Sequence, residues 1–223
     1  MKAFVVIPAY NEEKRIGKLI KMLKRENPDY VIVVDDGSDD GTCEIAKKYG
    51  AIVIRNERNM GKGYSVRRAL RWIEEHLAIR DEDVVVTMDA DLQHNPENLW
   101  ELVGKTRYYD VVIGKRDKRK YTFIKKLGNA LISLIVSFML FKSIPDCESG
   151  YKAIKWKVFK KILPFMTANR YAIEGEILIL ASKFRFSIGF VPVSSTYIKG
   201  KGVGVIDGIK NAIHYARVWL GLI

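Results

Sequence analysis

Residues 84 to 96 read VVVTMDADLQHNP: an apolar run leads into two aspartates, Asp89 and Asp91, and then into Gln93, the only glutamine of the chain. A continuous apolar run is typical of a strand buried on both faces of a sheet. Carboxylate and amide oxygens are the ligands that Mg²⁺ and Mn²⁺ prefer. The three side chains therefore fit a divalent-metal site at a strand end, and the alternative is that the two aspartates cap the helix that follows.

The same alternation of apolar runs and helix-like segments continues on both sides of this stretch. With the strand in 83–91, the apolar runs predict strands within 2–10, 30–42, 51–55 and 108–114. The segments between them carry apolar residues at helical spacing, as between Ile16 and Leu23. Continuous apolar strands that alternate with helices predict the α/β class, with a mostly parallel sheet flanked by helices on both faces.

Ligands of such a sheet bind at the carboxyl ends of its strands, so the loops after the strands form the candidate site. Five loops are expected to converge on one crevice: 8–12, 35–39, 61–63, 89–93 and 114–116. In the third of them, Gly61 and Gly63 lack the Cβ atom that would keep a diphosphate from backbone amides and Lys62. The alternative for this loop is an ordinary turn into a helix.

Beyond residue 115 the pattern changes from strands to basic and apolar segments. A basic loop at 115–126 precedes a very apolar helix at 127–141, and a strand and a short helix are predicted within 149–163. A helix over 171–184, one or two strands within 185–198 and an amphipathic helix over 205–220 complete the chain. These apolar helices are expected either in the core or at a membrane interface.

Charge is distributed unevenly along the 223 residues. Residues 1–100 hold 16 Lys and Arg against 18 Asp and Glu, whereas residues 101–223 hold 22 against 8. The basic second half predicts an anionic partner such as nucleic acid, an anionic membrane surface or a phosphorylated substrate, unless it is simply a solvated basic surface. No nucleic-acid motif is recognisable, so no nucleic-acid partner is expected.

The cysteines and the apolar runs predict a cellular compartment. Two cysteines cannot build a disulfide framework, which favours a reducing cytoplasm. The longest apolar run, 131–141, is shorter than the roughly 18 residues that cross a bilayer, so no membrane-spanning segment is expected.

Several motifs occur in an order that resembles a known family. They are PAYNEE at 8–13, VVDDGSDDGT at 33–42, NMGKG at 59–63, MDADLQHNPE at 88–97, GKR at 114–116 and PDCESGYKAIK at 145–155. Together they resemble the family 2 glycosyltransferases with the GT-A, Rossmann-like fold. The similarity extends to the branch of dolichyl-phosphate mannose synthases, dolichyl-phosphate glucose synthases and bacterial polyprenyl-phosphate glycosyltransferases. It implies one GT-A domain over 1–223, with the nucleotide sugar bound by 1–115 and the acceptor by 116–223.

This resemblance implies roles for individual residues. The nucleotide sugar would be bound by Pro8, Tyr10, Glu12, Asp36, Lys62, Asp89 and Ala90. A Mg²⁺ or Mn²⁺ ion would be bound by Asp89, Asp91 and Gln93. The catalytic residues would be Asp91, Arg116 and Glu176. Glu174 and Glu176 match an acidic pair that lies near the active site in the family, and the alternative is that they are surface acids of a helix. The basic residues predicted to bind an acceptor phosphate are Arg116, Lys125, Lys126, Lys199 and Lys201. Asp35 is expected to stabilise its turn or to lie beside the nucleotide.

The resemblance also implies the reaction. We expect an inverting, metal-dependent transfer of a hexose, with mannose favoured, from GDP-mannose or UDP-glucose to dolichyl or polyprenyl phosphate. Because a lipid phosphate is already anionic, no strong general base is needed. The alternatives are a UDP-glucose-dependent glucosyltransferase, a transferase with a soluble sugar or protein acceptor, and a basic module that binds membrane or nucleic acid without catalysis.

An enzyme of this kind is expected at the cytoplasmic face of a membrane. There it would contact the anionic surface peripherally, or a separate membrane protein would anchor it.

Overall fold

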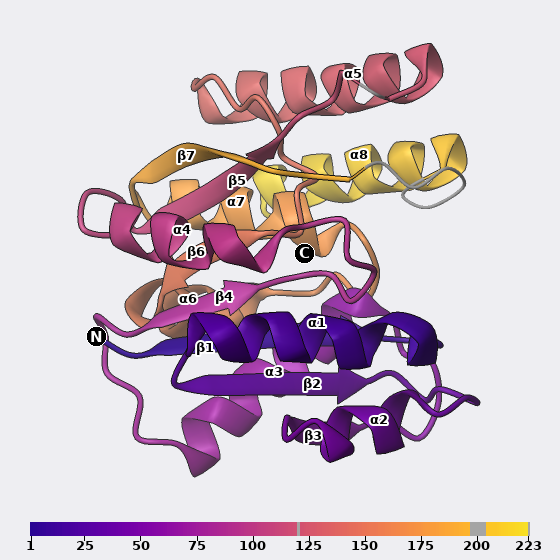
Figure 1. The fold of residues 1–223 in the computed structure, drawn as a ribbon. Helices are drawn as coiled ribbons and strands as arrows, with labels where there is room; N and C mark the ends of the chain where they lie inside the picture. The colour runs from indigo at the N-terminus through magenta and orange to yellow at the C-terminus, as the bar shows by residue number, and fades with distance from the viewer. Residues whose placement is uncertain (120, 197–203, 223) are drawn as a thin grey trace.

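The computed structural model describes residues 1–119, 121–196 and 204–222, and of residues 124, 125, 205 and 206 it describes the backbone alone. A seven-stranded sheet, in the order β3-β2-β1-β4-β6-β5-β7, forms its centre (Figure 1). The strands are β1 (Ala3–Ala9), β2 (Tyr30–Asp35), β3 (Ile52–Arg55), β4 (Val84–Thr87), β5 (Val111–Arg116), β6 (Lys152–Lys155) and β7 (Ile188–Val193). Described pairs are parallel except those that β6 makes with β4 and β5, which confirms the predicted mostly parallel sheet.

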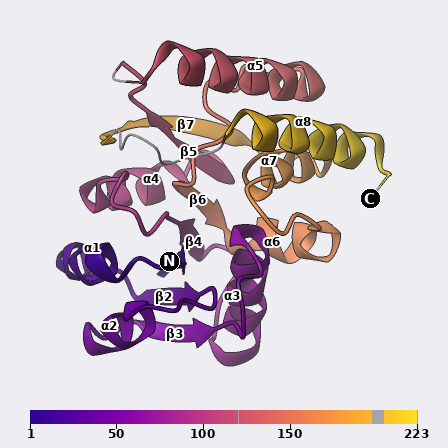
Figure 2. The same ribbon diagram turned by 90° about the vertical axis from the view of Figure 1, so that its right-hand side faces the viewer.

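Helices cover both faces of this sheet. They are α1 (Glu13–Glu26), α2 (Thr42–Lys48), α3 (Lys62–His76), α4 (Leu99–Lys105), α5 (Phe123–Leu140), α6 (Trp156–Ile162), α7 (Ile173–Lys183) and α8 (Val205–Leu220). Helices α1, α2 and α4 share one apolar core with the sheet, and α3, α6 and α7 share the other. Helices α5 and α8 contact each other and α7 at the end of the sheet that β5 and β7 form (Figures 1 and 2).

The apolar spacing of the sequence explains which helix faces are buried. In α1 the residues at helical spacing, Ile16, Leu19, Ile20 and Leu23, are fully buried, as predicted. Helix α7 differs because its apolar residues surround the helix, and Ile177 to Ala181 are all buried. A helix that is apolar all round is a core helix, so α7 is the packing centre of the second half.

Strand β6 brings a distant segment to the end of β4. It pairs antiparallel with β4 on one side and with β5 on the other. The chain therefore enters β6 at the edge of the sheet where β4 ends. There the Thr87 hydroxyl donates to the Gly150 carbonyl at 3.0 Å. The strand and short helix predicted within 149–163 are thus β6 and α6, and the antiparallel direction of β6 has no signal in the sequence.

Helix α5 buries only part of its apolar surface. Val136 is fully buried, whereas large side chains of the helix and its C-cap are more than half exposed. The exposed ones are Phe123, Leu127, Leu131, Leu134, Phe138 and Phe141. Helix α5 therefore packs one face against the core and leaves its other apolar face exposed. Within the described residues, we find no helix with the length and hydropathy required to cross a membrane.

Candidate active site

The five predicted loops line one cavity of about 890 Å³. Each loop contributes to the lining, which includes Pro8, Tyr10, Glu12, Asp36, Gly61, Lys62, Asp89, Ala90, Asp91, Gln93 and Arg116. The convergence follows from the sheet, because the carboxyl ends of its parallel strands lie at the same edge. The opposite wall is apolar and is built from α5 and α8 by Leu131, Ile132, Ile135, Ile209, Ala212 and Ile213.

Asp36 organises the loop that leads into α3. Its buried carboxylate accepts hydrogen bonds from the backbone N–H groups of Met60 and Gly61, at 2.9 and 2.8 Å, and from Asn56 Nδ2 at 2.6 Å. It lines the cavity, but its carboxylate already has three partners within the protein. Asp35, by contrast, accepts from the backbone N–H of Ser38 at 3.1 Å, as its turn-stabilising alternative predicts.

The glycines of the 61–63 loop allow this loop to lie close to the backbone of residues 168–170. A Cβ atom on Gly61 would lie 2.4 Å from the Asn169 carbonyl oxygen, and one on Gly63 would lie 2.2 Å from the Ala168 carbonyl oxygen. Gly61 also has a φ of +96°, which side-chain-bearing residues rarely adopt. The two glycines therefore seat the loop against residues 168–170 and position Lys62 at the cavity.

Lys62 links two acidic residues on the cavity floor. Its ammonium contacts the Asp89 carboxylate, and it lies 2.6 Å from Glu174 Oε1. Burial alone would lower the pKa of Lys62, but Asp89 and Glu174 outweigh this and raise it above its ordinary value. Burial would likewise raise the pKa of Asp89, but Lys62 and His94 hold it well below its usual range. The pair is therefore a charged lysine and a charged carboxylate.

Glu174 has a second cationic partner in Lys152 of β6, which is completely buried. Lys152 is not among the residues predicted from the sequence. The available signal was a lysine at an interior position of an apolar strand, where a charged residue is rare unless it is paired.

Asp91 and Gln93 meet in the turn after β4. The Asp91 carboxylate accepts from the backbone N–H of Gln93 at 3.0 Å and from its side-chain amide. Within the described residues, no group of three or more His, Cys, Asp or Glu side chains is arranged to hold a metal ion. Asp89, Asp91 and Gln93 all line the cavity and together offer a set of carboxylate and amide oxygens, with Asp89 paired to Lys62 in this structure. Such a set suits Mg²⁺ or Mn²⁺ when phosphate oxygens of a ligand complete the coordination.

Arg116 also lines the cavity and is held by Asp146. Its Nε and Nη2 donate to the two Asp146 carboxylate oxygens at 2.8 and 2.7 Å, and its backbone N–H donates at 3.1 Å. Burial would lower the pKa of Arg116, but Asp146 outweighs this and raises it. The guanidinium is thus charged and fixed in the lining of the cavity.

The remaining predicted residues divide into three groups. Lys126 is exposed and lines a separate shallow hollow with Arg116 and Lys118. Lys199, Lys201 and the side chain of Lys125 lie outside the described residues. Glu176, predicted to be catalytic, does not line the cavity. Its carboxylate accepts from the backbone N–H groups of Thr167 and Ala168 and lies 3.0 Å from His214 Nε2.

Glu176 therefore holds α7 to a loop and to α8, and the acidic residue of this helix that reaches the cavity is Glu174. Only Glu174 of the two reaches the cavity because residues two positions apart on a helix point in different directions.

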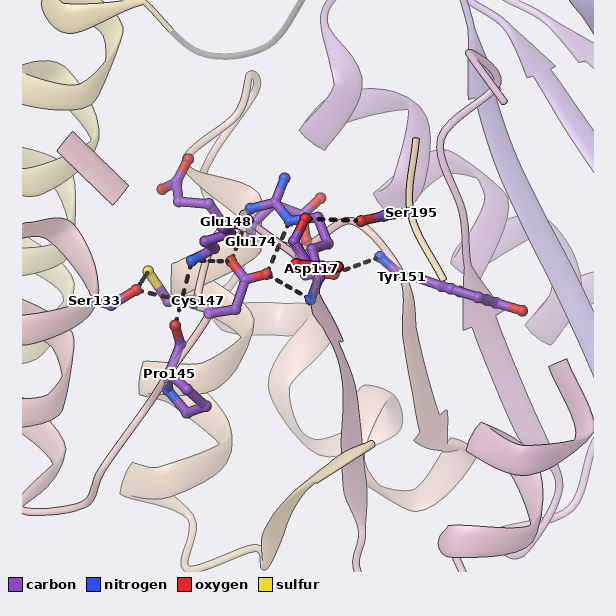
Figure 3. A network of polar contacts seen from close by, with 12 residues as sticks. Asp117, Ser133, Pro145, Cys147, Glu148, Tyr151, Glu174 and Ser195 are labelled. Atoms are coloured by element: carbon purple, nitrogen blue, oxygen red, sulfur yellow. Dashed lines mark hydrogen bonds and ion pairs between the residues drawn. The ribbon is translucent and has the colours of Figure 1, made fainter. Parts of the chain in front are cut away.

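Sequence analysis also missed Glu148, which lines the cavity and is buried. Its Oε1 accepts from the Tyr215 hydroxyl at 2.7 Å and lies 3.4 Å from Asn211 Nδ2, so α8 holds it. Burial raises the pKa of Glu148. Figure 3 shows Glu148 in a network of polar contacts, together with Pro145, Cys147, Tyr151 and Glu174.

The architecture defines the class of protein. The chain has the GT-A fold of glycosyltransferases, as in glucosyl-3-phosphoglycerate synthase from Mycobacterium tuberculosis, solved with Mn²⁺, UDP and glucosyl-3-phosphoglycerate. The similarity has a TM-score of 0.77 at 22% sequence identity and covers 99% of this chain and 79% of that one. The profile of Glycosyl transferase family 2 matches residues 4–163, so the chain belongs to this family and is a glycosyltransferase.

Two relatives with named activities match nearly the whole chain. The UDP-N-acetylglucosamine–dolichyl-phosphate N-acetylglucosaminyltransferase of Methanococcus voltae is 31% identical over 236 residues, which cover 93% of this chain and 92% of the relative. A dolichyl-phosphate beta-glucosyltransferase of Trichomonas vaginalis is 28% identical over 233 residues, which cover 96% of this chain and 72% of the relative.

Proposed function

We propose that this glycosyltransferase moves a sugar from a nucleotide diphosphate sugar to dolichyl or polyprenyl phosphate, with inversion at the anomeric carbon. The observation that carries the proposal is the composition of the cavity. One side consists of polar loops at the ends of β1, β2 and β4, and the other side is the apolar wall of α5 and α8. A polar, anionic donor and an acceptor with a hydrocarbon chain require these two kinds of surface next to each other.

The named relatives favour a UDP-linked donor. One carries the name of an N-acetylglucosaminyltransferase that uses UDP-N-acetylglucosamine, and the other that of a glucosyltransferase. Both names specify dolichyl phosphate as the acceptor. Neither supports the preference for mannose, so we propose UDP-N-acetylglucosamine or UDP-glucose ahead of GDP-mannose.

The donor and the acceptor phosphate have separate places along the cavity. Loops 8–12 and 61–63, with Asp36, suit the nucleoside, and Asp89, Asp91 and Gln93 would hold a Mg²⁺ or Mn²⁺ ion at its diphosphate. When bound, such an ion neutralises the charge of the departing diphosphate. Arg116 would bind the acceptor phosphate and reduce its repulsion from the diphosphate. Because that phosphate oxygen is already anionic, it attacks the anomeric carbon without a general base.

The acceptor would reach the cavity from a membrane surface. Leu131, Ile209 and Ile213 line the cavity and are also more than half exposed. The apolar wall of the cavity is thus continuous with the outer surface of α5 and α8. Amphipathic helices with flanking basic residues bind anionic membrane surfaces in this way. We propose that the chain lies peripherally on the cytoplasmic face of a membrane, by itself or beside an anchoring membrane protein.

Transfer of labelled sugar into organic-extractable lipid tests the proposal. The purified protein is incubated with Mn²⁺, a polyprenyl phosphate and one labelled donor: UDP-N-acetylglucosamine, UDP-glucose or GDP-mannose. We expect label in the lipid from one UDP-sugar, and loss of that label in Asp91→Ala. Label that appears only in a water-soluble acceptor would overturn the lipid assignment and leave the family assignment intact.

A further inference from the structure

The segment from Asp146 to Gly150 connects the Arg116 site to the Asp89 site, and its residue Glu148 lines the cavity. At one end Asp146 binds Arg116 through both carboxylate oxygens. At the other end Gly150 lies against Asp89, since a Cβ atom built on Gly150 would be 2.3 Å from Asp89 Oδ2. Glu148 is the middle residue of this segment. If the diphosphate lies at Asp89 and the acceptor phosphate at Arg116, Glu148 lies where the sugar passes from one to the other.

The Glu148 side chain is held in place, but only one of its two carboxylate oxygens has a hydrogen-bond partner in the described structure. It is 8% exposed, and its Oε1 accepts from Tyr215 at 2.7 Å. The same Tyr215 oxygen accepts from the backbone N–H of Gly175 at 3.2 Å, which ties Glu148 to both α8 and α7. Oε2 makes no hydrogen bond within the described part of the chain. A buried carboxylate oxygen without a donor is unfavourable, so it marks a place where a ligand is expected to supply one.

Its neighbour Glu174 shows the contrast. Glu174 is also buried, but Lys62 and Lys152 contact its two carboxylate oxygens. Both of its oxygens are therefore satisfied without a ligand. Glu148, by contrast, has a buried carboxylate oxygen that accepts no hydrogen bond within the described structure.

The chemistry of the groups that the cavity would hold shows which of them can donate a hydrogen bond to Oε2 of Glu148. A carboxylate oxygen accepts hydrogen bonds and repels anions, so neither the diphosphate nor the acceptor phosphate fits it. The lipid chain has no donor, and the nucleoside is assigned to the loops after β1 and β2. Of the groups that this cavity must hold, the sugar alone brings O–H or N–H donors to this position.

We propose that Oε2 of Glu148 accepts a hydrogen bond from a hydroxyl or acetamido N–H of the sugar to be transferred, and that Glu148 thereby determines which sugar is used. The inference rests on the proposed function, since it requires a nucleotide-sugar donor at Asp89 and an acceptor phosphate at Arg116. Tyr215 and Asn211 act through Glu148 as positioning residues.

Calorimetric binding with Glu148→Gln tests the proposal, using nucleotides with and without sugar. The probes are UDP against UDP-N-acetylglucosamine and UDP-glucose, and GDP against GDP-mannose, each with Mn²⁺. The variant amide oxygen stays with Tyr215, so an NH₂ donor replaces the free acceptor. We expect the ratio of Kd for the sugar nucleotide to Kd for the plain nucleotide to rise at least about tenfold, with Kd for the plain nucleotide unchanged within about twofold.

Two further variants separate sugar binding from folding. In Glu44→Gln the altered side chain is 67% exposed, and the ratio should stay at the wild-type value. Tyr215→Phe removes the hydroxyl that orients Glu148 and should raise the ratio by a smaller factor. Thermal unfolding of each variant identifies any loss of folded protein.

The inference would be overturned if this ratio of Kd values is the same in Glu148→Gln as in the wild type. That includes the case in which Kd for the plain nucleotide and Kd for the sugar nucleotide rise by the same factor. If the ratio rises but the wild type transfers nothing to polyprenyl phosphate, the lipid acceptor is wrong and the role of Glu148 stands. A wild-type chain that binds none of the nucleotide pairs would overturn both proposals.

Discussion

Because Gly150 has no side chain, its backbone can lie close to the Asp89–Lys62 pair. A Cβ atom at this residue would lie 2.3 Å from Asp89 Oδ2 and 2.7 Å from Lys62 Nζ. Gly150→Ala should therefore displace the Asp89–Lys62 pair and reduce kcat/KM for sugar transfer by about tenfold to a hundredfold, because small displacements of positioning groups are costly. Initial rates with the preferred UDP-sugar measure this effect.

Gly104→Ala is the matched control for this substitution. A Cβ atom on Gly104 of α4 meets nothing within 4 Å, so this variant should keep the wild-type rate. Equal rates for the wild type and the Gly150 variant would mean that the Asp89–Lys62 pair tolerates displacement and does not position the donor.

At the scale of elements, Glu176 connects α7 to the loop before it and to α8. Removing its carboxylate leaves the N–H groups of Thr167 and Ala168 without their acceptor. We expect Glu176→Ala to lower the free energy of unfolding by about 2 to 4 kcal/mol, as measured by urea denaturation. Nucleotide binding per folded molecule should stay unchanged. Lost binding with full stability would instead restore the catalytic role expected from the sequence.

Asp110 connects β5, β7 and α6 in a comparable way. Its carboxylate accepts from the Ser187 N–H and hydroxyl at 3.0 and 2.8 Å and lies 2.8 Å from Lys157 Nζ. Burial raises its pKa, but Lys157 and Ser187 outweigh this and hold the pKa at about 2. Because the folded value lies below the unfolded one, the stabilisation is present above about pH 4 and is lost as pH falls towards 2.

Asp110→Asn should therefore show a smaller loss of stability than the wild type between about pH 4 and pH 2. Urea unfolding at several pH values measures the two slopes, with Glu101→Gln as an exposed control. Parallel pH profiles for Asp110→Asn and the wild type would contradict the assignment.

At the scale of the whole molecule, the exposed apolar face of α5 and α8 predicts membrane binding. Leu134 and Phe138 of α5 are 66% and 72% exposed. Replacing both with serine should leave stability nearly unchanged but weaken binding to anionic vesicles at least about tenfold, since each buried apolar side chain contributes roughly 1.5 to 3 kcal/mol. Vesicle flotation measures this binding. Tyr108→Ser, at a residue that is 75% exposed and follows α4, is the control.

Equal flotation of the double variant and the wild type would show that α5 does not contact the bilayer. Unimpaired UDP-sugar binding by the double variant would confirm that the donor site is intact.

The local pattern of the sequence determined the order of strands and helices and the five loops that line the cavity. These features follow from apolar periodicity and from the shared edge of parallel strands, which a chain carries residue by residue. For the same reason the acidic turn at 89–93 could be identified before the fold was known.

Only the tertiary structure decided which side chains meet. It inserted β6 antiparallel between β4 and β5 and thereby placed Lys152 against Glu174. It also turned Glu174, and not Glu176, towards the cavity. The wall that α5 and α8 share joins segments about eighty residues apart. Such contacts depend on how distant elements pack, and side-chain direction and burial follow from that packing and not from local spacing.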